Sequence, residues 1–340
     1  MKKFCLLPAS ERADFIYQYA TPRSAPAFIV EKDFWVCWLL GRIFGEKDLG
    51  EQVVFKGGTS LSKVFGVIQR FSEDIDLSIS PASLGWDEAR PRDAGSSRQL
   101  RKLTDQLEAD CARAVEHAWR PKLEEDARHE LGAPAGGGGW FAYRLDPMTH
   151  SPVLEFSYPQ AVPPGTYIAP IVRIEFGSLT DQQPTGKHPL VPLISLLAPG
   201  MFADFRCDVV ALELERTFWE KATILHAEYH RPPGKPLRDR FARHYADFAA
   251  LWKHPAGRKA AERLDLLDRV RVHKSRFFAS SWANYEEARP GTLRFAPPAA
   301  REGELRRDYE SMKPMFLSAP PTFPEILATL REAETTLNEG

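Results

Sequence analysis

The sequence predicts an α+β protein, with a mixed sheet and helices in residues 1–205 and a mainly α-helical part in residues 206–340. Three observations predict this. Short runs of β-forming residues with period two occur up to about residue 212. From residue 213 onward, helical spacing of apolar residues dominates. A chain of 340 residues is also longer than one hydrophobic core usually supports, which favours two domains.

The first elements are two helices. Residues 10–19 are predicted to form a short helix with Ser10 as its N-cap, because serine accepts hydrogen bonds from the first turn. Residues 28–45 are predicted to form a longer helix that has almost no polar surface. A helix that is apolar all round is normally buried, so we expect this one to lie beneath the sheet.

The most informative stretch reads as a strand, a glycine turn, a helix and a second strand. The β-formers of 53–55 end at Gly57 and Gly58, where the chain must turn tightly or approach a ligand closely. Apolar residues at helical spacing follow in 60–71, and residues 73–80 then alternate with period two. That alternation places Asp74 and Asp76 on one face of the second strand.

Further elements follow the same rules. Residues 81–98 are rich in turn formers, and residues 97–131 carry an apolar stripe typical of a long amphipathic helix. The remaining predicted elements are strands at 152–158, 169–177 and 205–212, helices at 216–229 and 239–253, and a proline-rich link at 289–300.

Two carboxylates on one strand face have a chemical consequence. At an effective dielectric constant near 20 they repel by about 4 kcal/mol at ~4 Å, and a hard cation removes that repulsion. We therefore predict that Asp74 and Asp76 bind Mg²⁺, with Mn²⁺ as the alternative ion. The amide groups of Gly57 and Gly58 and the hydroxyls of Thr59 and Ser60 are suited to the phosphates of an NTP. This combination indicates nucleotidyl transfer.

These residues resemble a known family. A glycine pair, a helix and Asp-x-Asp resemble the DNA polymerase β-like nucleotidyltransferase superfamily. Within it, the sequence motifs of this chain are similar to those of the AbiEii/AbiGii toxin branch. The segments that carry this similarity are 31–36, 56–63, 70–77, 215–221 and 243–248.

The resemblance implies a polymerase β-like nucleotidyltransferase domain followed by a helical domain, and it adds site residues. Glu175 would be the third carboxylate, which completes a metal site or accepts the proton of the attacking hydroxyl. Lys221 would reach the triphosphate of the nucleotide. Asp247, together with Arg243, would orient Lys221 or the nucleotide itself.

Each added residue also has a structural alternative. Glu175 could form a plain ion pair with Arg173, and Lys221 could extend along apolar neighbours to solvent. Arg243 and Asp247 are four residues apart, as in an ordinary stabilising helix pair. Glu155, also in an apolar strand, is the fallback for the third carboxylate. Lys63 is expected to be solvated, and residues 31–33 to cap and dock a helix without chemistry.

The resemblance further implies a bacterial toxin of a toxin–antitoxin or phage-defence pair, with an antitoxin partner. Its acceptor would be the 3′ end of tRNA. Two alternatives stay open: nucleotidylation of a protein or small molecule, and a nucleotide-binding interaction module with little turnover. The intact pair of Asp74 and Asp76 argues against the module, because binding alone does not require it.

Charge and cysteine content limit the function classes. The formal net charge of -1 excludes the global basic field of many nucleic-acid binders. Residues 221–260 nevertheless hold nine Lys and Arg against three acids, which predicts a local basic surface. The four cysteines show no metal-binding or disulfide spacing, and no apolar run is long enough to span a membrane. We expect a cytoplasmic protein with reduced thiols.

Overall fold

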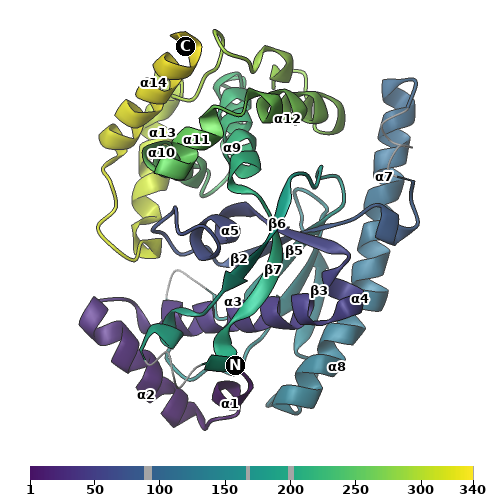
Figure 1. The fold of residues 1–340 in the computed structure, drawn as a ribbon, viewed down its shortest axis with the longest axis vertical. Helices are drawn as coiled ribbons and strands as arrows, with labels where there is room; N and C mark the ends of the chain where they lie inside the picture. Colours follow the sequence, from purple (N-terminus) through teal and green to yellow (C-terminus); the bar gives the residue numbers. More distant parts are fainter. Residues whose placement is uncertain (88–93, 166–168, 198–202, 340) are drawn as a thin grey trace. The chain divides into compact units, whose positions relative to one another are not determined.

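The computed structural model describes residues 1–87, 94–165, 169–197 and 203–339 (Figure 1). The chain forms two compact units. Unit 1 comprises Met1–Val64 and Phe71–Ala211, and unit 2 comprises Phe65–Arg70 and Leu212–Gly340. A short piece of the first half of the sequence thus belongs to the unit built mainly from the second half. That the chain folds as two domains, 1–205 and 206–340, stays a prediction.

Unit 1 is built on a mixed seven-stranded sheet with the strand order β3-β4-β5-β2-β1-β7-β6. Strand β2 pairs antiparallel with β1 and parallel with β5. The expected class, a mixed sheet with helices followed by a mainly helical part, is confirmed. The strands are β1 (Val53–Lys56), β2 (Asp74–Ile79), β3 (Phe141–Leu145), β4 (Pro152–Phe156), β5 (Val172–Gly177), β6 (Thr185–Leu190) and β7 (Cys207–Leu212).

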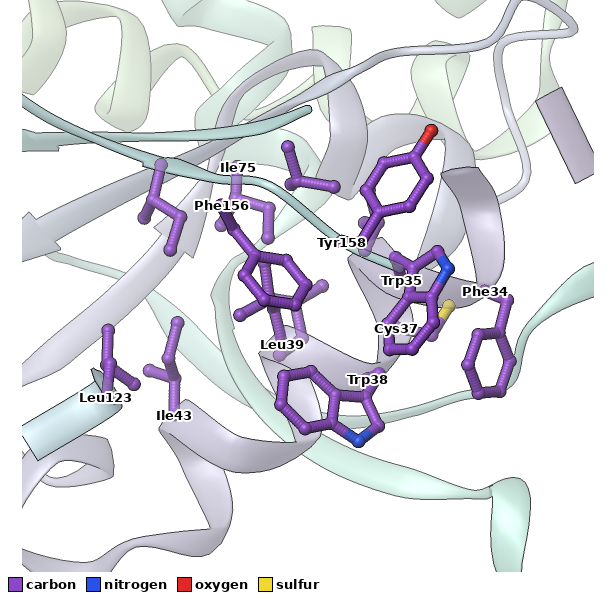
Figure 2. Close-up of a cluster of buried hydrophobic side chains, with 14 of the residues drawn as sticks. Phe34, Trp35, Cys37, Trp38, Leu39, Ile43, Ile75, Leu123, Phe156 and Tyr158 are labelled. Atoms are coloured by element: carbon purple, nitrogen blue, oxygen red, sulfur yellow. The ribbon is translucent and has the colours of Figure 1, made fainter. Parts of the chain in front are cut away.

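The core of unit 1 lies between one face of this sheet and helix α3 (Ala27–Gly45). Figure 2 shows the aromatic side chains of α3 against those of the sheet and the segment after β4. Trp35 stacks on Tyr158 and Trp38 stacks on Phe156, with ring centroids 5.8 and 5.5 Å apart. The predicted burial of this helix beneath the sheet is confirmed, because an all-apolar helix needs cover on every side.

The long amphipathic helix predicted at 97–131 is present as three consecutive segments. They are α7 (Ser97–Ala114), a π-helical segment (Val115–Trp119) and α8 (Arg120–Leu131). Pro121 lacks the amide hydrogen that a regular helix needs, and the π segment ends two residues before it, at Trp119. The helix stays continuous because its apolar stripe packs on the core.

Several sequence-based expectations need correction. Ser10 is not an N-cap, because helix α2 (Ala9–Ala20) begins after Pro8. The helix predicted at 60–71 is α5 (Gly57–Lys63), which includes the glycines and ends early. The chain enters unit 2 at Phe65, and the next residue, Gly66, has φ +63°. The edge strands β3 and β6 were not predicted, since neither carries a continuous run of β-formers. Of the turn-rich stretch 81–98, residues 88–93 lie outside the described part.

Unit 2 is a helical unit that also includes residues 65–70. The helix predicted at 239–253 begins only at Ala242, since Arg240 has φ +58°. Its helices are α9 (Leu214–Tyr229), α10 (Ala242–Lys253), α11 (Pro255–Ala261), α12 (Leu264–Phe277), α13 (Ala299–Ser311) and α14 (Phe323–Glu339). The remaining α-helices are α1 (Lys2–Cys5) and α4 (Lys47–Gly50), both in unit 1.

Short 3₁₀ turns join several of these elements. They are Thr21–Arg23, Ala82–Leu84, Leu193–Leu196, Ala203–Phe205, Tyr285–Glu287 and Lys313–Met315. All four cysteines are unpaired thiols, as expected. Among the helices of the described residues, none is both long and apolar enough to cross a bilayer.

Candidate active site

The three predicted carboxylates of unit 1 lie on one face of the sheet. In the parallel pairing of β2 with β5, Asp74 is opposite Arg173 and Asp76 is opposite Glu175. Residues that are directly paired across strands point to the same side of a sheet. The other face of β2 carries Ile75, which is fully buried in the core. Period-two alternation therefore separates a hydrophobic face from a charged face that carries the three carboxylates and Arg173.

The glycine turn is fitted to one of these carboxylates. Gly57 has φ +80°, a left-handed conformation that side chains disfavour. A Cβ atom placed on Gly57 would lie 2.0 Å from Oδ2 of Asp76, far inside contact distance. Only glycine leaves room for the Asp76 side chain here. The turn and the carboxylate therefore form one local structure.

The hydroxyls of Thr59 and Ser60 point inward in this structure. The Thr59 hydroxyl donates a hydrogen bond to the carbonyl oxygen of Asp74, and the Ser60 hydroxyl donates to that of Gly57 at 2.9 Å. Both residues are fully buried. These bonds tie the glycine turn to the start of β2. The backbone amides of Gly57 and Gly58 begin helix α5, where no intrahelical acceptor exists.

Three consecutive buried charged residues of α3 hold the glycine turn, α5 and β2 in place. Asp33 pairs with Lys63 of α5 at 2.6 Å, and Lys32 pairs with Glu73, directly before β2, at 2.9 Å. Glu31 accepts a hydrogen bond from the backbone amide of Ala161. The docking role predicted for residues 31–33 is therefore what their contacts show.

The expectation that Lys63 is solvated was wrong. Its side chain is largely buried against Asp33, and this pairing fixes α5 on α3. Burial alone would lower the pKa of Lys63, but Asp33 raises it above its ordinary value. No local spacing rule could predict this contact, because the two partners are 30 residues apart in the chain.

The carboxylates fit a divalent cation that takes only part of its ligands from protein. Asp74, Asp76 and Glu175 are all partly exposed, and oxygen is the donor that Mg²⁺ prefers. Among the described residues, no three His, Cys, Asp or Glu side chains converge into a ready metal cage. Mg²⁺ commonly uses one or two carboxylates together with substrate phosphates and water. Asp74 and Asp76 match that pattern.

Glu175 is less available than the resemblance implies. One of its oxygens lies 3.2 Å from the Arg173 guanidinium, and both side chains are about one-third exposed. Arg173 is also 3.6 Å from Asp146. The fallback, Glu155, pairs instead with Arg144 at 2.8 Å. Glu175 is thus the carboxylate adjacent to Asp76, but it carries an ion pair of its own.

A second charged centre lies within unit 2. Lys221 of α9 contacts Asp247 of α10 at 2.7 Å, so the structure brings these two predicted residues together. Asp247 is also held by Arg70, whose Nε lies 2.7 Å from Oδ1 and whose Nη2 lies 2.8 Å from Oδ2. Arg243, the predicted partner of Asp247, is not among the ion-pair partners found in the described residues. Lys221 Nζ also lies 3.3 Å from His244 Nδ1.

Burial dominates the electrostatics of this centre. Burial alone would raise the pKa of Asp247, but Arg70 and Lys221 hold it well below its ordinary value. Burial lowers the pKa of Lys221, and Arg70 and Arg243 lower it further, against the effect of Asp247. Burial, with Lys221 and Arg243, also keeps the pKa of His244 far below its usual range. The imidazole is therefore neutral at pH 7. Two basic side chains, Arg70 and Lys221, share the single carboxylate of Asp247.

Sequence reasoning missed Arg70 as a site residue. It stands inside the quoted motif 70–77, four positions before Asp74, but no spacing rule links it to Asp247. Arg70 and Asp247 also line a pocket of about 490 Å³ in unit 2. The other walls come from residues 67–69, from three alanines and Lys253 of α10, from Phe316 and residues 318–321, and from the first half of α14.

Part of the predicted basic surface is neutralised by the protein itself. Within 221–260, the cations Lys221, Arg231 and Arg258 form ion pairs with carboxylates. Lys235 and Arg238 are exposed. The stretch therefore keeps positive charge on its surface, although less than its composition suggests.

Comparison with known proteins identifies a family. A family model described as the nucleotidyl transferase AbiEii toxin of type IV toxin–antitoxin systems matches residues 38–332. No curated protein matches the sequence. Among solved structures, the nucleotidyltransferase toxin MenT4 from Mycobacterium tuberculosis H37Rv is similar at 14% identity with a TM-score of 0.39. The match covers 96% of this chain and 97% of that one.

Proposed function

We propose that this chain, which belongs to the AbiEii family of nucleotidyltransferase toxins, transfers a nucleoside monophosphate from an NTP to the 3′ end of tRNA with the aid of Mg²⁺. The family match establishes a nucleotidyltransferase toxin of a type IV toxin–antitoxin system, with an NTP substrate and an antitoxin partner. The ion, the acceptor and the roles of individual residues are the proposal.

One observation carries the assignment of the catalytic centre. The Gly57 turn and the Asp76 carboxylate are in such close contact that a single methyl group would separate them. A turn that offers backbone amides thus meets a carboxylate that stands beside Glu175 in the sheet. Amides that bind phosphate oxygens and carboxylates that bind a cation are the two parts that phosphoryl transfer requires next to each other.

The residues of unit 1 have distinct roles in this proposal. Asp74 and Asp76 hold the divalent ion, which supplies positive charge against the phosphates when bound. Gly57 and Gly58 contribute amide donors, while the buried hydroxyls of Thr59 and Ser60 fix the turn rather than bind the nucleotide.

Glu175 accepts the proton of the acceptor hydroxyl as that oxygen attacks the α-phosphorus. To do so, it must exchange its contact with Arg173, a partly exposed pair of modest strength. The bond from the α-phosphorus to the bridging oxygen then breaks, and pyrophosphate leaves.

The residues of unit 2 supply positive charge for the nucleotide. Lys221 carries an ammonium whose counter-charge, Asp247, is shared with Arg70. An anionic phosphate would restore the charge balance of this buried centre. We propose that Lys221 and Asp247 act together in binding the triphosphate, with Arg243 as a further cation.

The experiment that tests this function uses α-³²P-labelled NTPs, purified tRNA and Mg²⁺, with Asp76→Asn as the inactive control. We expect label in the tRNA band only with the wild-type protein. Periodate-oxidised tRNA, which has no 3′ hydroxyl groups to attack, should stay unlabelled. Label on oxidised tRNA, or label on protein in a whole-cell lysate, would contradict the proposed acceptor. Equal labelling by Asp76→Asn would contradict the proposed centre.

A further inference from the structure

Arg70 makes a contact that the proposed chemistry does not yet use. Its guanidinium forms a two-pronged pair with Asp247, and the same carboxylate receives the ammonium of Lys221 at 2.7 Å. Arg70 and Asp247 are 3% and 1% exposed, so water screens this pair very little. Two parallel hydrogen bonds fix the plane of a carboxylate, whereas a single one does not.

The backbone that carries Arg70 is itself anchored in unit 2. Arg70 forms an antiparallel bridge with Phe316, and the amide of Leu317 donates to the carbonyl oxygen of Gln69 at 3.1 Å. Val67 and Ile68, beside it in the sequence, are buried. The guanidinium therefore extends from a fixed segment rather than from a mobile loop.

We infer that Arg70 is a positioning residue, which holds Lys221 in place for the nucleotide by fixing the carboxylate of Asp247. This inference rests on the proposed function of Lys221. It extends the site to a segment of the chain that directly precedes the strand of Asp74 and Asp76.

The charges around Lys221 make this role measurable. The groups that face its ammonium are Arg70 from the segment before β2, and Arg243, His244 and Asp247 from α10. On α9 itself, the neighbouring Glu220 is engaged by Arg216 and Lys274. Arg70 lowers the pKa of Lys221 through space and also competes for Asp247. Removal of the Arg70 charge should therefore raise the pKa of Lys221.

Two variants separate charge from geometry. Arg70→Gln removes the charge, and Arg70→Lys keeps the charge but loses the two-pronged contact. Arg263→Gln is the matched control, because Arg263 forms an exposed pair with Asp265 in the same unit. For each protein, the ¹⁵Nζ NMR signal of Lys221, assigned by its loss in Lys221→Arg, is followed with pH in the absence of substrate. kcat and KM for NTP are measured alongside.

We expect Arg70→Gln to move the Lys221 titration upward by about one pH unit, and Arg70→Lys to move it much less. Both variants should lower kcat/KM at least tenfold, whereas the control should match the wild type in both measurements. If Arg70→Gln does not fold, Arg70→Lys still tests the geometric part through kcat/KM.

An unchanged Lys221 titration in folded Arg70→Gln, or full kcat/KM in Arg70→Lys, would overturn the inference. Failure of the proposed function has a different signature. In that case Lys221→Arg would retain full transfer activity, although the titration in Arg70→Gln would still shift.

Discussion

The two charged centres of this protein differ in how they balance their charge. In unit 1, Asp74 and Asp76 gather negative charge on a partly exposed sheet face. In unit 2, Arg70, Lys221 and Asp247 form a buried cluster in which one carboxylate contacts two basic side chains. The first centre is partly open to solvent, whereas the second is almost entirely buried.

This difference separates function from stability. Exposed like charges repel each other and lower the free energy of unfolding slightly. They become favourable only when a cation or substrate binds. A buried pair that loses one member leaves the other charged and without solvent. We therefore expect substitutions in unit 1 to act mainly on activity, and substitutions in the buried cluster to act first on folding.

The largest expected effect is on activity alone. Asp76→Ala should reduce nucleotide transfer by about 1000-fold or more, because it removes a proposed ligand of the divalent ion. The midpoint of urea unfolding, measured without metal, should stay the same or rise slightly, since carboxylate repulsion is relieved. A marked loss of stability would mean that Asp76, like Asp247, holds the fold together.

Asp247→Ala should act mainly on stability, in contrast to Asp76→Ala. It leaves Arg70 and Lys221 buried without their counter-charge, a change that typically costs about 3–5 kcal/mol of unfolding free energy. Urea denaturation followed by tryptophan fluorescence measures this. Asp265→Ala, which breaks the exposed pair with Arg263, is the control and should cost less than about 1 kcal/mol. Similar losses of unfolding free energy in the two variants would show that burial does not make the Asp247 cluster more sensitive than an exposed pair.

Gly57→Ala tests how closely the glycine turn is fitted to Asp76. A methyl group 2.0 Å from Oδ2 must displace the carboxylate. If Asp76 has its proposed role, a shift of about 1 Å at that group costs about 100-fold in rate. Transfer assays and circular dichroism distinguish this from unfolding. Gly234→Ala, where no atom lies near the added carbon, should be neutral. Normal activity of Gly57→Ala would show that Asp76 is not held against the turn.

The smallest predicted effect is a pH dependence of unit 2. His226 is buried, its Nε2 lies 3.1 Å from the carbonyl oxygen of Asn284, and its Nδ1 lies 3.3 Å from the amide of Arg294. These contacts suit a neutral imidazole that donates from Nε2 and accepts at Nδ1. Burial lowers the pKa of His226 to about 4, from an ordinary value of 6.5.

The folded protein therefore binds this proton less readily than the unfolded chain, and stability falls as pH drops from about 6.5 toward 4. Between pH 6.5 and 4.5 the loss should be about 2 kcal/mol. Urea titrations at several pH values, compared with His226→Gln, isolate this contribution. A pH slope that is identical in the variant would show that His226 does not cause it.

Local pattern determined much of unit 1 in advance. Period-two alternation was enough to place Asp74 and Asp76 on the face opposite Ile75, and the apolar surface of 28–45 was enough to bury that helix. Such predictions succeed because the geometry of a strand or helix fixes which of a few neighbouring side chains share a face. The glycine pair likewise marked the turn, although not its fit to Asp76.

Other features depended on contacts between distant parts of the chain. The pattern of 60–71 read as one helix, yet the helix ends at Lys63 and the residues after Val64 pack into unit 2. Apolar residues at helical spacing show that a segment is buried but not against which partner.

The sequence alone therefore determined the strand–turn–helix–strand motif, the pair of carboxylates and the family resemblance, since each depends on short stretches of chain. Only the tertiary structure decided that Asp247 lies between Arg70 and Lys221, which are 177 and 26 residues away from it. The physical reason is that a buried charge is stable only when an opposite charge lies next to it in space. That neighbour is fixed by packing rather than by position in the sequence.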